Sequence, residues 1–190
     1  MKKLVLLALF ALLAPPLAAP AHAERFPPVD DPTVKAECGA CHMVYFPQML
    51  PQKSWKRILG NLSNHFGEDA SLDAAALKAV LAYHLANAAD VSGVRAAGKW
   101  RQGLSAGDAP ERITTTPRFL RKHDEIQPSA WSDPRVGSKA NCGACHKGVA
   151  KSGIFDEDRV EGDWGNGFFG TIASMFRNLF GEDDDDGRRE

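Results

Sequence analysis

One pentapeptide occurs twice in this chain and limits what the chain can fold into. It reads Cys-Gly-Ala-Cys-His at residues 38–42 and again, letter for letter, at residues 142–146. Two thiols at this spacing can form thioether bonds with the two vinyl groups of one porphyrin, and the histidine that follows can then bind the iron as an axial ligand. The motifs contain all the cysteines of the chain: Cys38, Cys41, Cys142 and Cys145. The sequence therefore predicts two covalently bound c-type haems, with His42 and His146 as one axial ligand each.

Other uses of four cysteines fit the sequence less well. A disulfide framework is typical of secreted chains under about 100 residues, and a thioredoxin-like redox pair does not explain a histidine after both pairs. Two Cys-x-x-Cys pairs can also form a Cys₄ zinc site. In such sites about 15–20 residues separate the pairs, far fewer than lie between Cys41 and Cys142.

The first 23 residues have the layout of a secretory signal peptide. Lys2 and Lys3 precede an apolar run over residues 4–14, and Ala21-His22-Ala23 is a small-x-small cleavage site. The run is shorter than the roughly 20 residues that cross a bilayer, and no later run approaches that length. We therefore expect a mature protein that begins near Glu24, lies in a bacterial periplasm and has no transmembrane segment.

The charge of the chain argues against nucleic acid as a partner. The sequence has 23 basic and 24 acidic residues, a formal net charge of −1. No basic patch with interleaved aromatic residues is visible, so the sequence does not predict binding to nucleic acid.

The first half of the chain carries two helical patterns. Residues 24–34 are rich in proline, which predicts an exposed, extended leader. Apolar residues at helical spacing then predict a helix over residues 55–66, capped by Ser54. A second helix is predicted over residues 72–88, capped by Ser71.

This layout resembles a class I cytochrome c domain over about residues 30–90. A short helix over residues 35–42 leads into the first motif, and a loop and two helices follow, with Tyr83 near the end. The resemblance implies an N-terminal helix that packs across a C-terminal one. Residues 89–117 are punctuated by glycine and proline and predict irregular chain, with a short helical turn over residues 119–124 before the second motif.

The expected fold class is mainly α: a class I cytochrome c-like helical haem domain, followed by a second haem domain of mostly irregular chain. The expected division is 1–23 signal peptide, 24–92 first haem domain, 93–165 second haem domain and 166–190 an amphipathic helix with an acidic tail. The tail carries apolar residues at helical spacing over residues 167–180 and an acidic run after them. It fits either docking to a partner or membrane surface, or packing over an exposed haem edge.

The sixth ligand of each iron decides the chemistry. Class I domains usually supply a methionine, but Met43 adjoins His42 on the wrong side of the haem, Met49 follows too closely, and residues 50–174 contain no methionine. Histidine is the alternative ligand. The first haem has two candidates, His65 at the edge of one apolar stripe and His84 near the middle of the other, and helical geometry alone favours His84.

The second haem has a shorter list of candidates. The chain after His146 is too short for another class I domain, so the distal ligand should come from upstream, where His123 is the nearest histidine. Met175 is the downstream alternative.

Three stretches resemble the small bacterial di-haem cytochrome c family over about residues 35–150. They are His-Phe-Gly-Glu at 65–68, Phe-Leu-Arg-Lys-His at 119–123 and the second haem motif with its preceding asparagine. In that family both haems are bis-histidine, which implies His65 and His123 as distal ligands. Members of the family tend to have an aliphatic residue at the position of His84, so His84 departs from the pattern.

The predicted function is electron transfer between redox partners through two low-potential bis-histidine haems, without enzymatic activity. The family resemblance implies a membrane b-type cytochrome as donor and an oxygen-binding mono-haem cytochrome c as acceptor. Two alternatives remain: a peroxidase-like enzyme or gas-binding sensor with one open haem, and a di-haem cytochrome with histidine and methionine ligands.

Overall fold

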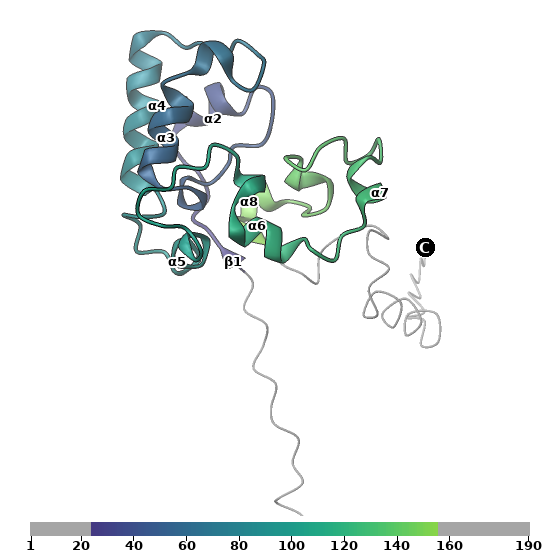
Figure 1. Cartoon of the computed structure of the whole chain (residues 1–190). Coiled ribbons are helices and arrows are strands. Elements are labelled where there is room, and N and C mark those ends of the chain that lie inside the picture. The colour runs from purple at the N-terminus through teal and green to yellow at the C-terminus, as the bar shows by residue number, and fades with distance from the viewer. Residues whose placement is uncertain (1–23, 156–190) are drawn as a thin grey trace, which may run out of the picture.

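The computed structural model describes residues 24–155, shown in colour in Figure 1. The expected signal peptide, the amphipathic stretch over 167–180 and Met175 lie outside the described residues. Within them the structure is mainly α, as predicted. Seven helices are present in the described part: α2 Pro32–Cys38, α3 Gln52–Leu59, α4 Ala74–Asn87, α5 Arg95–Arg101, α6 Pro117–Lys122, α7 Pro128–Trp131 and α8 Val149–Ser152. The strands are β1 Glu24–Arg25 and β2 Ile154–Phe155, and short 3₁₀ helices lie at Pro47–Met49, Leu62–Asn64, Ile113–Thr115 and Cys142–Ala144.

Helices α2, α3 and α4 pack together and form the helical half of the molecule (Figure 1). The carboxylate of Asp31 caps α2 by accepting from the Val34 N–H at 2.9 Å. Asp73 caps α4 by accepting from the N–H groups of Ala75 and Ala76, both at 2.8 Å. Side-chain oxygens at this position satisfy N–H groups that have no partner within the helix, at a gain of about 1 kcal/mol.

The main apolar core runs from the helical half into the second half of the chain. Phe26 and Phe46 are fully buried and stack with ring centroids 5.1 Å apart. The same cluster includes Trp100 of α5, Phe119 of α6 and Val149 of α8. The core therefore crosses residue 92, where we drew a domain boundary, and the division at that residue stays a prediction.

The prediction of an exposed leader over residues 24–34 was wrong. Phe26 and Val34 are fully buried, and β1 pairs with β2 in antiparallel register. The Phe26 N–H donates to the Gly153 carbonyl at 2.8 Å. Gly153 has φ +66°, and a Cβ there would lie 2.0 Å from the Phe26 carbonyl oxygen, so this close contact requires glycine. Residues 24–31 are non-helical, as the proline content predicted, but residues 32–34 form the first turn of α2, and the proline content gave no information about burial.

Two helix ends also differ from the prediction. The helix expected over 55–66 begins after Pro51 and ends at Leu59, so Ser54 is a buried helical residue rather than the cap. Asp73, two residues after Ser71, caps the next helix.

The stretch expected to be irregular contains α5, where Ala96, Ala97 and Trp100 are buried. Its glycine-rich flanks hid the helical spacing of these three residues. The expected turn at 119–124 is α6, which starts earlier because the Thr116 hydroxyl accepts from the Phe119 N–H.

The second half of the chain is mostly loop, as expected. Helices α6, α7 and α8 are short and are joined by long irregular segments that gather beside the helical half (Figure 1). A small second apolar cluster there contains Ala130 and Val136. Among the helices of residues 24–155, none has the length and apolar character needed to cross a membrane.

Candidate functional site: two histidine pairs beside the thiol motifs

The first thiol motif begins where α2 ends. The Gly39 N–H donates to the Lys35 carbonyl at 3.1 Å and closes the helix, which leaves Cys38 half-buried and Cys41 exposed. None of the four cysteines is in a disulfide. Burial raises the pKa of the Cys38 thiol, so the neutral thiol dominates at pH 7.

His42 of the first motif faces His65. Their ring centroids are 6.2 Å apart and their planes are 27° from parallel. His65 is not helical, since it follows the 3₁₀ helix Leu62–Asn64 in a tight turn. In this turn its N–H donates to the Glu68 carbonyl at 2.7 Å and the Glu68 N–H donates back at 3.2 Å. The turn requires positive φ at Phe66 (57°) and Gly67 (107°).

His84, the alternative distal ligand, lies elsewhere. Its side chain is 3% exposed on α4, and its ring packs on Trp55 of α3 with centroids 4.4 Å apart. Its Nδ1–H donates to the Val80 carbonyl at 2.8 Å. Burial lowers its pKa, partly opposed by this hydrogen bond and by the charge of Asp31. His84 therefore contributes to the contact between α3 and α4.

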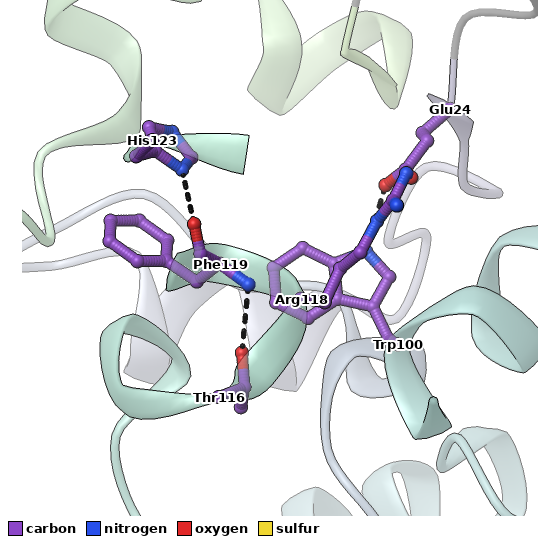
Figure 2. Close-up of polar contacts among 6 residues, drawn as sticks. All are labelled: Glu24, Trp100, Thr116, Arg118, Phe119 and His123. Atoms are coloured by element: carbon purple, nitrogen blue, oxygen red, sulfur yellow. Dashed lines mark hydrogen bonds and ion pairs between the residues drawn. The ribbon is translucent and has the colours of Figure 1, made fainter. Parts of the chain in front are cut away.

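His146 of the second motif is paired with His123. Their ring centroids are also 6.2 Å apart, but the planes are 87° from parallel. His123 follows the last residue of α6, and its Nδ1–H donates to the Phe119 carbonyl at 2.8 Å, as Figure 2 shows. The Phe119 ring stacks on it at 4.0 Å and 17°, and Trp131 lies at 5.8 Å. Burial lowers the pKa of His123, so the imidazole is neutral near pH 7.

A chain of polar contacts ties α6 to the start of the described chain (Figure 2). Arg118 of α6 forms an ion pair with the carboxylate of Glu24, and the Trp100 indole N–H donates to the same carboxylate at 2.9 Å. The side chains of Arg118 and Glu24 are 14% and 10% exposed. This ion pair therefore fixes α6, and with it the position of His123, against β1 and α5.

Both histidine pairs have the separation expected of two trans ligands on one metal. Bonds from imidazole nitrogen to a metal are about 2 Å long, and a five-membered ring with bonds of about 1.35 Å has a radius of about 1.1 Å. Two imidazoles on opposite sides of one ion therefore have centroids about 6 Å apart. The donor sets fit a haem iron, each with one histidine from a thioether motif and one from a distant segment.

Two of the four imidazoles also have a defined tautomer. The Nδ1 atoms of His42 and His123 lie 2.7 and 2.8 Å from the carbonyls of Met43 and Phe119. A carbonyl only accepts, so Nδ1 carries the proton and Nε2 keeps its lone pair for a metal. Such outer hydrogen bonds orient a ligating histidine and raise its basicity.

A cavity of about 480 Å³ lies beside the second motif. Cys142, Cys145, His146 and His123 line it together with apolar side chains that include Met49 and Ile113. Ligand and cofactor cavities are about 300–1,000 Å³ and mainly apolar, so the residues present fit a haem. Burial raises the pKa of Cys142 to about 11 and also raises that of Cys145.

Aromatic side chains surround the paired histidines, and among them the sequence placed only Phe119 beside His123, on one side of a short helical turn. Phe119 and Trp131 pack on His123, and the ring of Tyr45 stacks on His42 at 4.9 Å. Nothing in the sequence indicated the contacts of Trp131 or Tyr45. The assignment of His65 and His123 as distal ligands stays a prediction, which the two ring separations support.

Comparisons with known proteins agree with the two motifs. A family model described as dihaem cytochrome c matches residues 34–155. A solved diheme cytochrome c from Rhodobacter sphaeroides is 45% identical, with a TM-score of 0.61, and the match covers 67% of this chain and 98% of that one. A diheme cytochrome type c from Shewanella baltica is 38% identical, with a TM-score of 0.56, covering 68% and 90%. A comparison with curated proteins gives no match.

Proposed function

The chain belongs to the dihaem cytochrome c family and carries two covalently bound haem c groups, and on that premise we propose that it is an electron carrier whose two haem irons each have two axial histidines. The observation that carries the proposal is the pair of imidazole separations, 6.2 Å at both motifs. Cys38 and Cys41 hold the first haem and Cys142 and Cys145 the second. His42 with His65, and His146 with His123, are the axial pairs.

Two imidazoles on one iron leave no position for substrate, so the bound haem supplies one-electron oxidation and reduction only. A second imidazole gives a lower potential than a methionine thioether does. Protein contacts hold the distal histidine of each haem in place. The backbone turn at His65 fixes that histidine in the first site, and the Phe119 carbonyl fixes His123 in the second. Because the ligands are held before and after the electron arrives, little reorganisation accompanies transfer.

The cellular setting forms part of the same proposal. A family of c-type cytochromes from Gram-negative bacteria suggests a periplasmic location. We include the partners that the family resemblance implies, a membrane b-type cytochrome as donor and an oxygen-binding mono-haem cytochrome c as acceptor. Rapid mixing of the reduced protein with such an acceptor, followed by absorption at the haem bands, tests electron transfer from this protein to the acceptor.

Electron paramagnetic resonance of the fully oxidised protein tests the ligation. Nearly parallel imidazole planes separate the energies of the two iron d orbitals that overlap with the ligands. Perpendicular planes leave these two orbitals almost equal in energy. The angles of 27° and 87° therefore predict one rhombic low-spin signal from the first haem and one highly anisotropic low-spin signal from the second. Each signal should account for one haem per chain.

Addition of carbon monoxide to the reduced protein is the complementary test. Two saturated irons bind carbon monoxide slowly or not at all. A high-spin signal in the oxidised protein, or rapid binding at one haem, would instead support the enzyme or gas sensor. An absorption band from a thioether-to-iron transition would support histidine and methionine ligation.

A further inference from the structure

One side chain connects the surroundings of the two haem sites directly. The ring of Tyr45 stacks on the ring of His42 with centroids 4.9 Å apart and planes 29° from parallel. The hydroxyl of the same residue donates a hydrogen bond to the Ala140 carbonyl at 2.7 Å. Ala140 is separated from Tyr45 by 95 positions in the chain and lies two residues before Cys142.

The connection continues on the second side. The Cys142 N–H donates to the Ala140 carbonyl at 3.0 Å, and the Cys142 sulfur lies 3.6 Å from the same oxygen. The Ala140 carbonyl oxygen therefore accepts a hydrogen bond from the Tyr45 hydroxyl and also contacts Cys142, one of the two cysteines that hold the second haem. From His42 to Cys142 the path consists of one ring contact and two hydrogen bonds.

From this arrangement we propose that Tyr45 is the bridging residue for electron transfer between the two haems. Electrons tunnel more readily through bonds and hydrogen bonds than across van der Waals gaps, and this path has one such gap, the ring contact between His42 and Tyr45. Its remaining steps are covalent bonds and hydrogen bonds, which raise the electronic coupling. The step moves one electron from the reduced centre to the oxidised one, and no proton or atom is transferred. The inference rests on the proposed electron-transfer function.

Tyr45 also fixes the geometry of the two sites. It lies in the loop that follows the first motif, whereas Ala140 lies in the loop that leads into the second. The hydrogen bond holds the Ala140 segment against the helical half of the molecule, next to His42. Tyr45 is thus a positioning residue for the second motif in addition to its role in coupling.

The chain contains two tyrosines, which provides a matched pair of variants. Tyr45→Phe keeps the ring on His42 and removes only the hydrogen bond to Ala140, whereas Tyr45→Leu removes the ring as well. Tyr83→Phe is the control, because the Tyr83 hydroxyl is 3.4 Å from Asp30 at the surface of the helical half.

The measurement is the rate of electron equilibration between the haems after rapid photoreduction of one of them in the holoprotein. We expect a severalfold loss of rate in Tyr45→Phe, a larger loss in Tyr45→Leu and no change in Tyr83→Phe. Hydrogen exchange of the backbone around residues 138–146 should rise in both Tyr45 variants, because the Ala140 segment loses its anchor.

The two midpoint potentials and the low-spin signals are recorded for every variant. They should stay at the wild-type values in Tyr45→Phe, which keeps the ring on His42, and in Tyr83→Phe, which shows that coupling rather than driving force has changed. An unchanged rate in Tyr45→Phe, or a change of rate that follows wholly from shifted potentials, overturns the proposal. Failure of the bis-histidine function is distinct, since it would show as a high-spin signal or rapid carbon monoxide binding in the wild-type protein.

Discussion

The two histidine pairs have the same separation but are built in different ways. In the first, His65 comes from a tight backbone turn and lies nearly parallel to His42, 27° between planes. In the second, His123 follows a helix, is held through its own side chain by the Phe119 carbonyl and lies at 87° to His146. The comparison shows that an imidazole can be placed for a metal either by constraining the backbone that carries it or by constraining the ring itself.

This difference indicates which changes each site tolerates. The first site depends on an unusual backbone conformation at Phe66 and Gly67. The second depends on contacts made far away in the chain, including the ion pair between Glu24 and Arg118 (Figure 2). Variants can therefore be chosen that disturb one site and leave the other as an internal reference.

Replacement of a proposed distal ligand should have the largest effect. In His65→Met and His123→Met we expect the loss of the low-spin signal of one haem, the rhombic signal in the first variant and the anisotropic signal in the second. The potential of the altered haem should rise, since axial ligands set haem potentials over a range of roughly 0.8 V. Electron paramagnetic resonance and potentiometric titration measure both effects. Loss of the same signal in both variants would contradict the assignment of the pairs.

Glu24→Gln should have the next largest effect, confined to the second site. It leaves the positive charge of Arg118 in a partly buried position, and removal of one member of a buried ion pair is strongly destabilising. Because Gln still accepts from Trp100, we expect a loss of about 2 kcal/mol in the free energy of unfolding. The measurement is denaturant unfolding of the holoprotein, with the signal of the second haem broadened and that of the first unchanged.

An exposed ion pair offers the control for Glu24→Gln. Asp133 accepts from the Arg135 guanidinium at 2.8 Å, and the Arg135 side chain is 75% exposed. Asp133→Asn makes the same change from acid to amide, and surface pairs contribute about 0–1 kcal/mol. If Glu24→Gln cost no more than Asp133→Asn does, the burial of the Glu24 pair would have no bearing on stability.

The sequence predicted the parts of this site that depend on local covalent chemistry. The spacing within each Cys-x-x-Cys-His motif is a local property, so the motifs and the two haems followed from it, and the mainly α class followed from the helical spacing of apolar residues, which is also local. The helical stripe around His84 was also a local signal, and it favoured His84 as the distal ligand; in the structure His84 packs on Trp55, and the choice between His65 and His84 stays a prediction.

The features that sequence reasoning missed depend on long-range contacts. Nothing near Glu24 indicates that its carboxylate meets Arg118, and nothing near Tyr45 indicates a hydrogen bond to Ala140. The early end of α3 was missed because apolar spacing continues through Leu62 and Phe66. The chain instead leaves the helix at Gly60, and Phe66 is 46% exposed.

Gly67→Ala should disturb the first site alone. Gly67 has φ +107°, and a Cβ there would meet no atom within 4 Å, so the whole effect comes from the backbone conformation. Residues with side chains adopt such conformations at a cost of about 1–3 kcal/mol. We expect a loss of about 1 kcal/mol in the free energy of unfolding, with a shift in the rhombic low-spin signal.

Gly93→Ala is the control for Gly67→Ala. Its Cβ also meets open space, but the backbone there has no positive φ. At such a position alanine changes stability little or raises it by about 0.4–1 kcal/mol. Equal destabilisation by both substitutions would show that the Gly67 turn does not constrain His65.

The smallest expected effect is a change in the pH dependence of stability in His84→Leu. Burial lowers the pKa of His84 below the ordinary histidine value of about 6.5. The unfolded chain therefore takes up a proton at a pH where the folded chain does not, and the folded state loses stability as the pH falls below about 6.5. Thermal unfolding between about pH 7.5 and 5 should show a steeper decline in wild type than in His84→Leu, because leucine removes this titration. Both low-spin signals should persist in the variant, and loss of the rhombic one would transfer the role of distal ligand from His65 to His84.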